Sequence, residues 1–291
     1  MPIIRRIATS VPASVGPPLD PDQEVVAAFD RGEAVVAAAA GSGKTHTLVE
    51  WVARRIAGGT PPERVFVAAY NASAGHELKS RLAARLGAAV AKRVWAGTIH
   101  GLSWALWREA HGGDPRGRVD HVIGTDEAPK AFQILGPALR EAGMFLDIEM
   151  RDARTLSERV REAGILVPVE GEPDEDLLSA FRAAGAAGAA REAARASILY
   201  ERAKERRGLI DFTDMMLFLL RAARDGEAWA KSLQGRFAAV ALDEAQDANA
   251  VQAEIVSWLA VGSRTLLWVG DFRQAIYGFR GARPDLLQGR I

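Results

Sequence analysis

The stretch Ala34–Thr45, which reads Ala-Val-Val-Ala-Ala-Ala-Ala-Gly-Ser-Gly-Lys-Thr, decides the fold class of this 291-residue chain. Its apolar first half is typical of a short buried strand, and Gly41-Ser42-Gly43 breaks the run before a helical pattern. Small residues at such a turn let backbone N–H groups surround a phosphate, and the helix start adds a partial positive charge. The window Ala38–Thr45 departs from the pattern G-x-x-x-x-G-K-[ST] only at Ala38. We therefore predict a phosphate-binding loop, the alternative being an ordinary glycine-rich turn with a surface lysine.

Such a loop gives its last two residues distinct tasks. Lys44 can reach the outer phosphates of a nucleotide, and the Thr45 hydroxyl can bind Mg²⁺. The following helical pattern ends near Gly58, and a second apolar run, Val65–Ala69, precedes another helical pattern. Strands separated by helices of this length predict a parallel sheet with helices on both faces.

The alternation of strand and helix is interrupted in the middle of the chain. Residues 108–199 contain helical stretches without a strong strand run, and the α/β pattern returns with the apolar runs Phe237–Leu242 and Thr265–Val269. We predict an α/β lobe built from residues 1–107 and 200–291, with a mostly helical insertion subdomain over residues 108–199.

The composition is that of an ordinary soluble globular protein, with 48% hydrophobic and 25% charged residues and no cysteine. The net charge of zero excludes the global positive field of histone-like proteins. No apolar stretch approaches the roughly 20 residues that a membrane span requires. We therefore expect a cytoplasmic protein that does not cross a membrane.

A second candidate site follows the apolar run that ends at Leu242, where the sequence continues Asp243-Glu244-Ala245-Gln246-Asp247. Ligands of open parallel sheets bind at the carboxyl ends of the strands, so we expect these acids to face the same crevice as Lys44. Asp243 can hold Mg²⁺ through water, and Glu244 can orient and deprotonate an attacking water. The alternative is a helix N-cap with an acidic first turn.

A third candidate stretch, Val269–Ala282, carries one amide, two guanidinium groups and two aromatic rings after a strand-like run. Gln274 and Arg280 suit a terminal phosphate, whereas Tyr277 and Phe279 suit stacked bases. Core packing of the two rings is the alternative.

Together these three stretches resemble the N-terminal lobe of the UvrD/Rep/PcrA-like superfamily 1A DNA helicases. Weaker similarities occur in the family's order at Leu19–Gln23, Tyr70–Ala74, Gly97–Leu102 and Leu209–Met216. The resemblance implies a RecA-like P-loop NTPase sheet, ATP and Mg²⁺ as ligands, and a role for Gln23 in reading adenine. The residues that it assigns to ATP are Gln23, Ala40, Gly41, Ser42, Gly43, Lys44, Thr45 and His46.

The resemblance also implies a path for DNA and a set of catalytic groups. The DNA-binding residues would be Tyr70, Asn71, Thr98, His100, Tyr277 and Phe279, and the catalytic ones Lys44, Glu244, Gln274 and Arg280. The chain departs from the family where His46 replaces a common arginine, where Ala69 replaces a common phenylalanine, and where Phe279 replaces a common tryptophan.

The implied function is ATP-dependent 3′–5′ translocation on single-stranded DNA or at a single-strand/duplex junction. Because Ile291 follows Ala282 closely, we expect the second RecA-like lobe, with its arginine finger, to be supplied by another segment or chain. One lobe should hydrolyse ATP weakly and not unwind DNA alone. Two alternatives remain at this point: a regulatory half-helicase completed by a partner chain, and a P-loop ATPase that does not act on nucleic acid.

Overall fold

The computed structural model describes residues 17–39, 41–112, 121–123 and 130–271. Five of the predicted site residues lie outside this part of the chain: Ala40, Gln274, Tyr277, Phe279 and Arg280. The backbone contacts divide the described residues into two compact units. The first holds residues up to Leu102, Gly226–Ala248 and those from Gln252, and the second holds Ser103–Asp225 with Asn249–Val251.

The first unit is built on a five-stranded sheet in which every strand pair is parallel. The strands lie in the order β1-β7-β6-β2-β3, so the last two strands of the sequence lie between the first two. Their bounds are Gly32–Ala37 for β1, Val65–Ala69 for β2, Trp95–Thr98 for β3, Ala239–Leu242 for β6 and Thr265–Gly270 for β7. The predicted α/β class with a parallel sheet is confirmed.

Helices connect these strands, and their ends are set by local chemistry. Asp20 and Gln23 form a capping box at the start of α1, and the Asn71 side chain accepts the N–H of Ala74 at the start of α3. The helices in this part of the chain are α1 (Pro21–Ala28), α2 (Lys44–Ala57), α3 (Ala72–Leu86), α4 (Ala88–Ala91) and α11 (Ala228–Lys231). Two further helices, α5 (Ile99–Ala110) and α12 (Ala250–Leu259), contain residues of both units.

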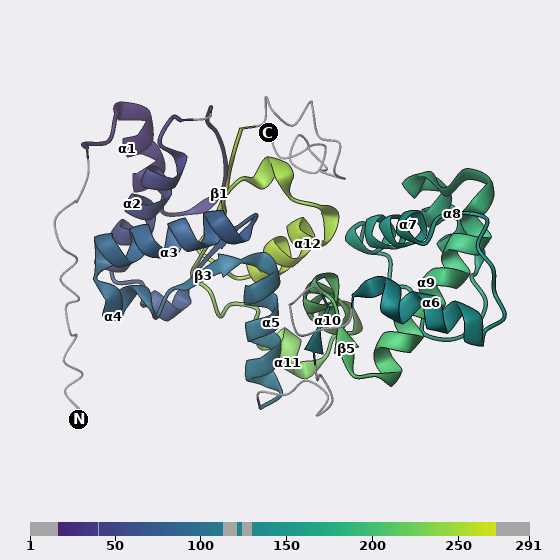
Figure 1. Cartoon of the computed structure of the whole chain (residues 1–291). Helices are drawn as coiled ribbons and strands as arrows, with labels where there is room; N and C mark the ends of the chain where they lie inside the picture. The colour runs from purple at the N-terminus through teal and green to yellow at the C-terminus, as the bar shows by residue number, and fades with distance from the viewer. Residues whose placement is uncertain (1–16, 40, 113–120, 124–129, 272–291) are drawn as a thin grey trace. The chain divides into compact units, whose positions relative to one another are not determined.

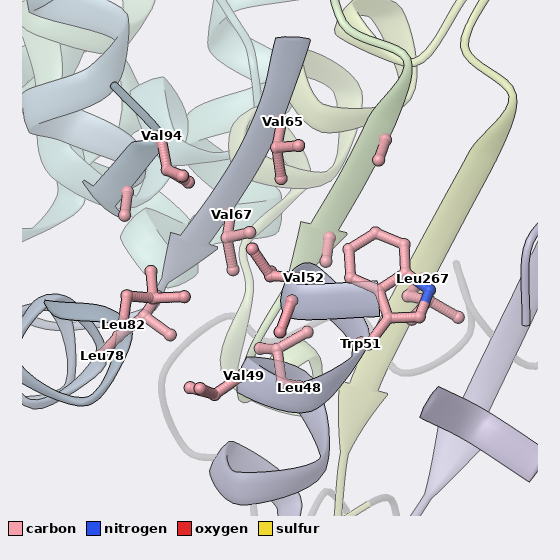
Figure 2. Close-up of a cluster of buried hydrophobic side chains, with 14 of the residues drawn as sticks. Leu48, Val49, Trp51, Val52, Val65, Val67, Leu78, Leu82, Val94 and Leu267 are labelled. Atoms are coloured by element: carbon pink, nitrogen blue, oxygen red, sulfur yellow. The ribbon is translucent and has the colours of Figure 1, made fainter. Parts of the chain in front are cut away.

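The core of the first unit packs α2 against the sheet (Figures 1 and 2). Leu48, Trp51 and Val52 of α2 are buried against the strands that carry Val67 and Leu267. Burial of each large side chain contributes roughly 1.5–3 kcal/mol, so this face of α2 is firmly held. The first residue of α2, Lys44, is thereby fixed at the carboxyl edge of the sheet.

The second unit is mostly helical. Its helices are α6 (Ala131–Glu141), α7 (Met150–Glu162), α8 (Glu175–Phe181), α9 (Ala190–Arg206) and α10 (Phe212–Asp225), with a two-stranded parallel sheet of β4 (His121–Val122) and β5 (Leu209–Ile210). Two apolar clusters fill it, one around Phe181 and one around Tyr200. No helix in the described ranges is both long and apolar enough to span a membrane.

The compact second unit extends beyond the insertion of residues 108–199 that the sequence pattern suggested. The difference at its C-terminal end has a physical reason. Asp211 and Asp214 at the start of α10 pair with Arg161 of α7 and Lys204 of α9, so β5 and α10 belong with those helices. Apolar periodicity does not reveal such ion pairs.

Candidate functional site

The glycine-rich loop lies between β1 and α2, and its backbone requires glycine. Gly41 and Gly43 have φ angles of +77° and +81°, which other residues rarely adopt. A Cβ atom on Gly43 would lie 2.8 Å from Nε2 of Gln23, whereas one on Gly41 would meet no atom within 4 Å. The loop is therefore packed on its Gln23 side and open at Gly41, and the start of α2 adds partial positive charge there.

The two motifs that the sequence separates by almost 200 residues are in direct contact. Nζ of Lys44 donates a hydrogen bond to Oε2 of Glu244 at 3.0 Å, and the two side chains are 9% and 32% exposed. Beside this pair, Oγ1 of Thr45 lies 3.4 Å from Oδ2 of Asp243. A cation, a hydroxyl and two carboxylates thus meet at the carboxyl edges of β1 and β6, as the sequence predicted.

The turn that carries Glu244 is strained and held in place by its neighbours. Glu244 has a φ of +52°, a conformation that costs a non-glycine residue about 1–3 kcal/mol. Its backbone N–H donates to Oδ1 of Asp243 at 3.0 Å, and its Oε2 also accepts from Nε2 of Gln246 at 2.8 Å. The Glu244 carboxylate is therefore fixed from two sides, by Lys44 and by Gln246.

Gln246 is a residue whose role the sequence did not indicate. Its Oε1 accepts the backbone N–H of Asp271 at 2.9 Å, so the side chain joins the acidic turn to the residue that follows β7. A Cβ atom on Gly270 would come within 2.3 Å of the same oxygen, so glycine is needed for this close approach. The available signal was an amide two residues after Glu244 together with a glycine at the end of a strand.

The environment of Asp243 favours its neutral form. Burial raises the pKa of this carboxyl, and the neighbouring Glu244 raises it further, to about 6. A bound divalent cation would reverse this effect by favouring the carboxylate. Because the Thr45 hydroxyl and the Asp243 carboxylate are both hard oxygen donors, the pair suits Mg²⁺.

A hollow of about 650 Å³ opens on the Gln23 side of the loop. Nε2 of Gln23 donates to the Ser42 carbonyl at 2.9 Å, and Nε2 of His46 lies 3.1 Å from the Pro17 carbonyl oxygen. Arg85 also lines the hollow and forms a largely buried pair with Glu50, with 2.6 Å between Nε and Oε1. The sequence did not indicate this pair, although a glutamate on an apolar face of α2 was a visible signal.

Four predicted DNA-binding residues lie at the carboxyl ends of the neighbouring strands β2 and β3. Tyr70 follows β2 and is half-buried, and Asn71 caps α3. Thr98 pairs with Ala69 in the sheet, and its hydroxyl accepts the N–H of Gly101 at 3.1 Å, whereas His100 is half-buried. These four residues lie at the same edge of the sheet, where the side chains of Asn71 and Thr98 accept backbone N–H groups.

A further cluster of carboxylates, in the second unit, resembles a metal site but already contains a cation. Single oxygen atoms of Glu201, Asp211 and Asp214 lie within 4.8 Å of one another. Nζ of Lys204 lies 2.9 Å from Glu201, 3.0 Å from Asp211 and 2.7 Å from Asp214. The lysine ammonium therefore takes the place that an ion would need.

Comparison with known proteins accounts for this arrangement. Residues 19–290 match the model of the UvrD/REP helicase N-terminal domain. The chain belongs to this family. DNA helicase II of Escherichia coli is 29% identical to it over 279 residues, which are 92% of this chain and 35% of that protein.

Two other relatives are also DNA helicases that this chain matches over part of their length. ATP-dependent DNA helicase Rep of Escherichia coli is 28% identical over 282 residues, covering 92% of this chain and 38% of Rep. ATP-dependent DNA helicase PcrA of Leuconostoc citreum is 28% identical over 264 residues, covering 87% of this chain and 32% of PcrA. The chain thus corresponds to the helicase N-terminal domain of UvrD-like ATP-dependent DNA helicases, and spans about a third of the length of these relatives.

Proposed function

We propose that this chain is the ATP-binding lobe of a helicase that moves 3′–5′ along single-stranded DNA by hydrolysing ATP. The observation that carries the ATP site is the contact between Lys44 and Glu244, with Thr45 and Asp243 beside it. The polarity and the movement on DNA are supported by the family resemblance.

The nucleotide-binding step is an exchange of partners by Lys44. A partly exposed ion pair contributes only about 0–1 kcal/mol, so the polyphosphate of ATP can replace Glu244 as the partner of the ammonium at little cost. Backbone N–H groups of the loop and the start of α2 bind the same phosphates. Gln23 and His46 line the hollow that would receive the base and ribose.

The exchange also prepares Glu244 for hydrolysis. Once Lys44 has moved to the phosphates, the Glu244 carboxylate is held by Gln246 and free to accept a proton. It takes that proton from a water whose oxygen attacks the γ-phosphorus, while the bond between this phosphorus and the β-bridging oxygen breaks and ADP leaves. Thr45 and Asp243 would hold Mg²⁺, which neutralises charge on the phosphates. Gln274 and Arg280 are proposed to respond to the γ-phosphate.

Single-stranded DNA would cross the edge formed by the ends of β2 and β3. Tyr70, Asn71, Thr98 and His100 come from this edge, and Tyr277 and Phe279 are proposed to join them. A second RecA-like lobe, carried by another segment or a partner chain, would supply the positive charge that completes the ATP site. We expect this lobe alone to turn over ATP slowly.

The test is ATP hydrolysis by the chain with and without single-stranded DNA, using Glu244→Gln as the control. DNA-stimulated turnover that the variant lowers by roughly 10²–10⁴-fold is expected if Glu244 is the base. Turnover that is unchanged by DNA, together with no binding of an oligonucleotide at low salt, would instead favour a P-loop ATPase without a nucleic-acid partner.

A further inference from the structure

A second hollow lies on the outer side of the terminal strand β3, away from the nucleotide site. It has a volume of about 600 Å³ and is enclosed by α3, α4 and β3, with Lys79, Leu82, Lys92, Val94, Trp95 and Leu102 among its lining residues. Since β3 is the last strand of the sheet in the described chain, no further strand covers this side. We call this feature the β3 hollow.

The charged residues that line the β3 hollow are basic. They are Lys79, Lys92 and Arg93, and none of the described lining residues is acidic. Arg93 pairs with Glu63 at 2.8 Å, whereas no ion pair of Lys79 or Lys92 with a carboxylate is found in the part of the chain that the structure describes. Both lysine side chains are exposed, so their charges are available to an anionic ligand.

The β3 hollow also offers an aromatic ring. Trp95 is half-buried, and the Arg236 guanidinium carbon lies 4.6 Å from its ring centroid. The guanidinium covers one side of the ring, and Trp95 is also among the residues that line the hollow. A ring fixed in this way can stack with a nucleobase, an interaction worth about 1–3 kcal/mol per base.

The hollow begins where the proposed DNA edge ends. Lys79 reaches across Gly97, whose added Cβ would lie 3.5 Å from the lysine Nζ and 3.7 Å from Cγ of Leu102. The next residue along β3 is Thr98, one of the residues proposed to contact DNA. A strand leaving Thr98 would therefore meet Lys79 first and then the ring of Trp95.

We propose that the β3 hollow binds one or two additional nucleotides of single-stranded DNA, with Lys79 and Lys92 at the phosphates and Trp95 beneath a base. This inference rests on the proposed DNA function. It extends the DNA path from the carboxyl ends of β2 and β3 along the open edge of the sheet at β3.

The test compares the binding of labelled oligothymidylates of about 5 and about 15 nucleotides, lengths near the limits of the roughly 4–16 nucleotides that single-strand-binding modules cover. The variants are Lys79→Ala, Lys92→Ala and their combination, all in the full 291-residue chain. Both lysines are exposed, so these changes should not disturb folding. Lys231→Ala, which removes one exposed charge from α11 of the same unit, is the matched control.

For the long oligonucleotide, each hollow variant should lower the slope of log affinity against log salt by about 0.7, and the control should leave it unchanged. Affinity for the short oligonucleotide should stay at the wild-type value. Equal slopes in Lys79→Ala, Lys92→Ala and Lys231→Ala would overturn the β3 hollow as a DNA site while leaving the proposed function intact. If the unmodified chain binds neither oligonucleotide at low salt, the DNA function itself fails, and the inference fails with it.

Discussion

Two groups of oppositely charged side chains in this chain differ in whether a ligand can replace one of the partners. In the first unit, one lysine and one glutamate form a partly exposed pair on a strained turn. In the second unit, Arg161 and Lys204, with side chains only 1% and 3% exposed, are surrounded by Glu201, Asp211 and Asp214. One partner of the first pair can be replaced by a ligand, whereas the second cluster encloses its two cations among three carboxylates.

The protonation behaviour of the two sites differs in the same way. Burial works against the charge of Lys204, but Asp214 and Glu201 outweigh it and raise the pKa of the ammonium. Burial alone would raise the pKa of Asp211, but Lys204 and Arg161 outweigh it and lower that pKa. At Asp243, burial and Glu244 outweigh the opposing contributions of Lys44 and the Thr45 hydroxyl, so its pKa is raised. In the cluster two cations compensate most of the charge of three carboxylates, whereas the Asp243 carboxylate is an unfavourable charge that a bound cation would relieve.

The largest effect on stability should come from breaking the cluster. Lys204→Met keeps the length of the side chain but leaves three carboxylates against Arg161 alone, so we expect a loss of about 3–5 kcal/mol in the free energy of unfolding. Urea denaturation measures it. Arg154→Ala, which removes an exposed pair with Glu158 on the same helix as Arg161, should cost less than about 1 kcal/mol. Similar losses in the two variants would refute the contrast between the sites.

A smaller change in the free energy of unfolding, and of opposite sign, is expected at the nucleotide site. Because the folded-state pKa of Asp243 is raised to about 6, the folded chain binds this proton more tightly than the unfolded chain does. Its carboxylate therefore destabilises the fold at pH 7, and this destabilisation disappears as the pH falls below 6 towards 4. Asp243→Asn should stabilise the ligand-free chain by on the order of 2 kcal/mol at pH 7 and by much less at pH 4.

Thermal unfolding at the two pH values measures this difference. Asp247→Asn, which changes an exposed carboxylate four residues further along the chain, is the matched control and should not reproduce the pH dependence. A destabilised Asp243→Asn chain at pH 7 would contradict the assignment of an unfavourable charge to this site.

The smallest expected effect is that of a change at His46, which lines the hollow beside the glycine-rich loop. Its ring nitrogen contacts the Pro17 carbonyl and so holds the segment that precedes Gln23. Loss of this bond in His46→Ala should cost about 1 kcal/mol of ATP binding, or roughly fivefold in Kd, with little change in the maximal hydrolysis rate. Titration with ATP and steady-state kinetics separate the two quantities. A large fall in the maximal rate would indicate that His46 acts on the reacting phosphate instead.

Local sequence signals predicted the fold class and the approach of Lys44 to Glu244. Apolar runs before Gly41 and Asp243 revealed β1 and β6, and the known position of ligands in parallel sheets predicted that Lys44 and Glu244 would meet. By contrast, β3 was not predicted, because Trp95–Thr98 is too short and irregular to show a period.

Contacts between distant residues account for most of what the sequence did not reveal. Gln246 gains its role from Gly270 and Asp271, and Arg85 gains its role from Glu50 on a different helix. Likewise, Lys204 looks like an ordinary residue of a helix C-terminus until the fold places Arg161, Asp211 and Asp214 around it, beside Glu201 of its own helix. Such partners are joined by tertiary packing, which no local pattern encodes.

The central claim is that Lys44 exchanges Glu244 for the phosphates of ATP. Calorimetric titration of Mg-ATP into the unmodified chain, Lys44→Ala and Glu244→Gln tests it most directly. The account predicts that Lys44→Ala loses measurable binding, while Glu244→Gln binds at least as tightly as the unmodified chain because the competing carboxylate is gone. Unchanged affinity in Lys44→Ala would contradict the account.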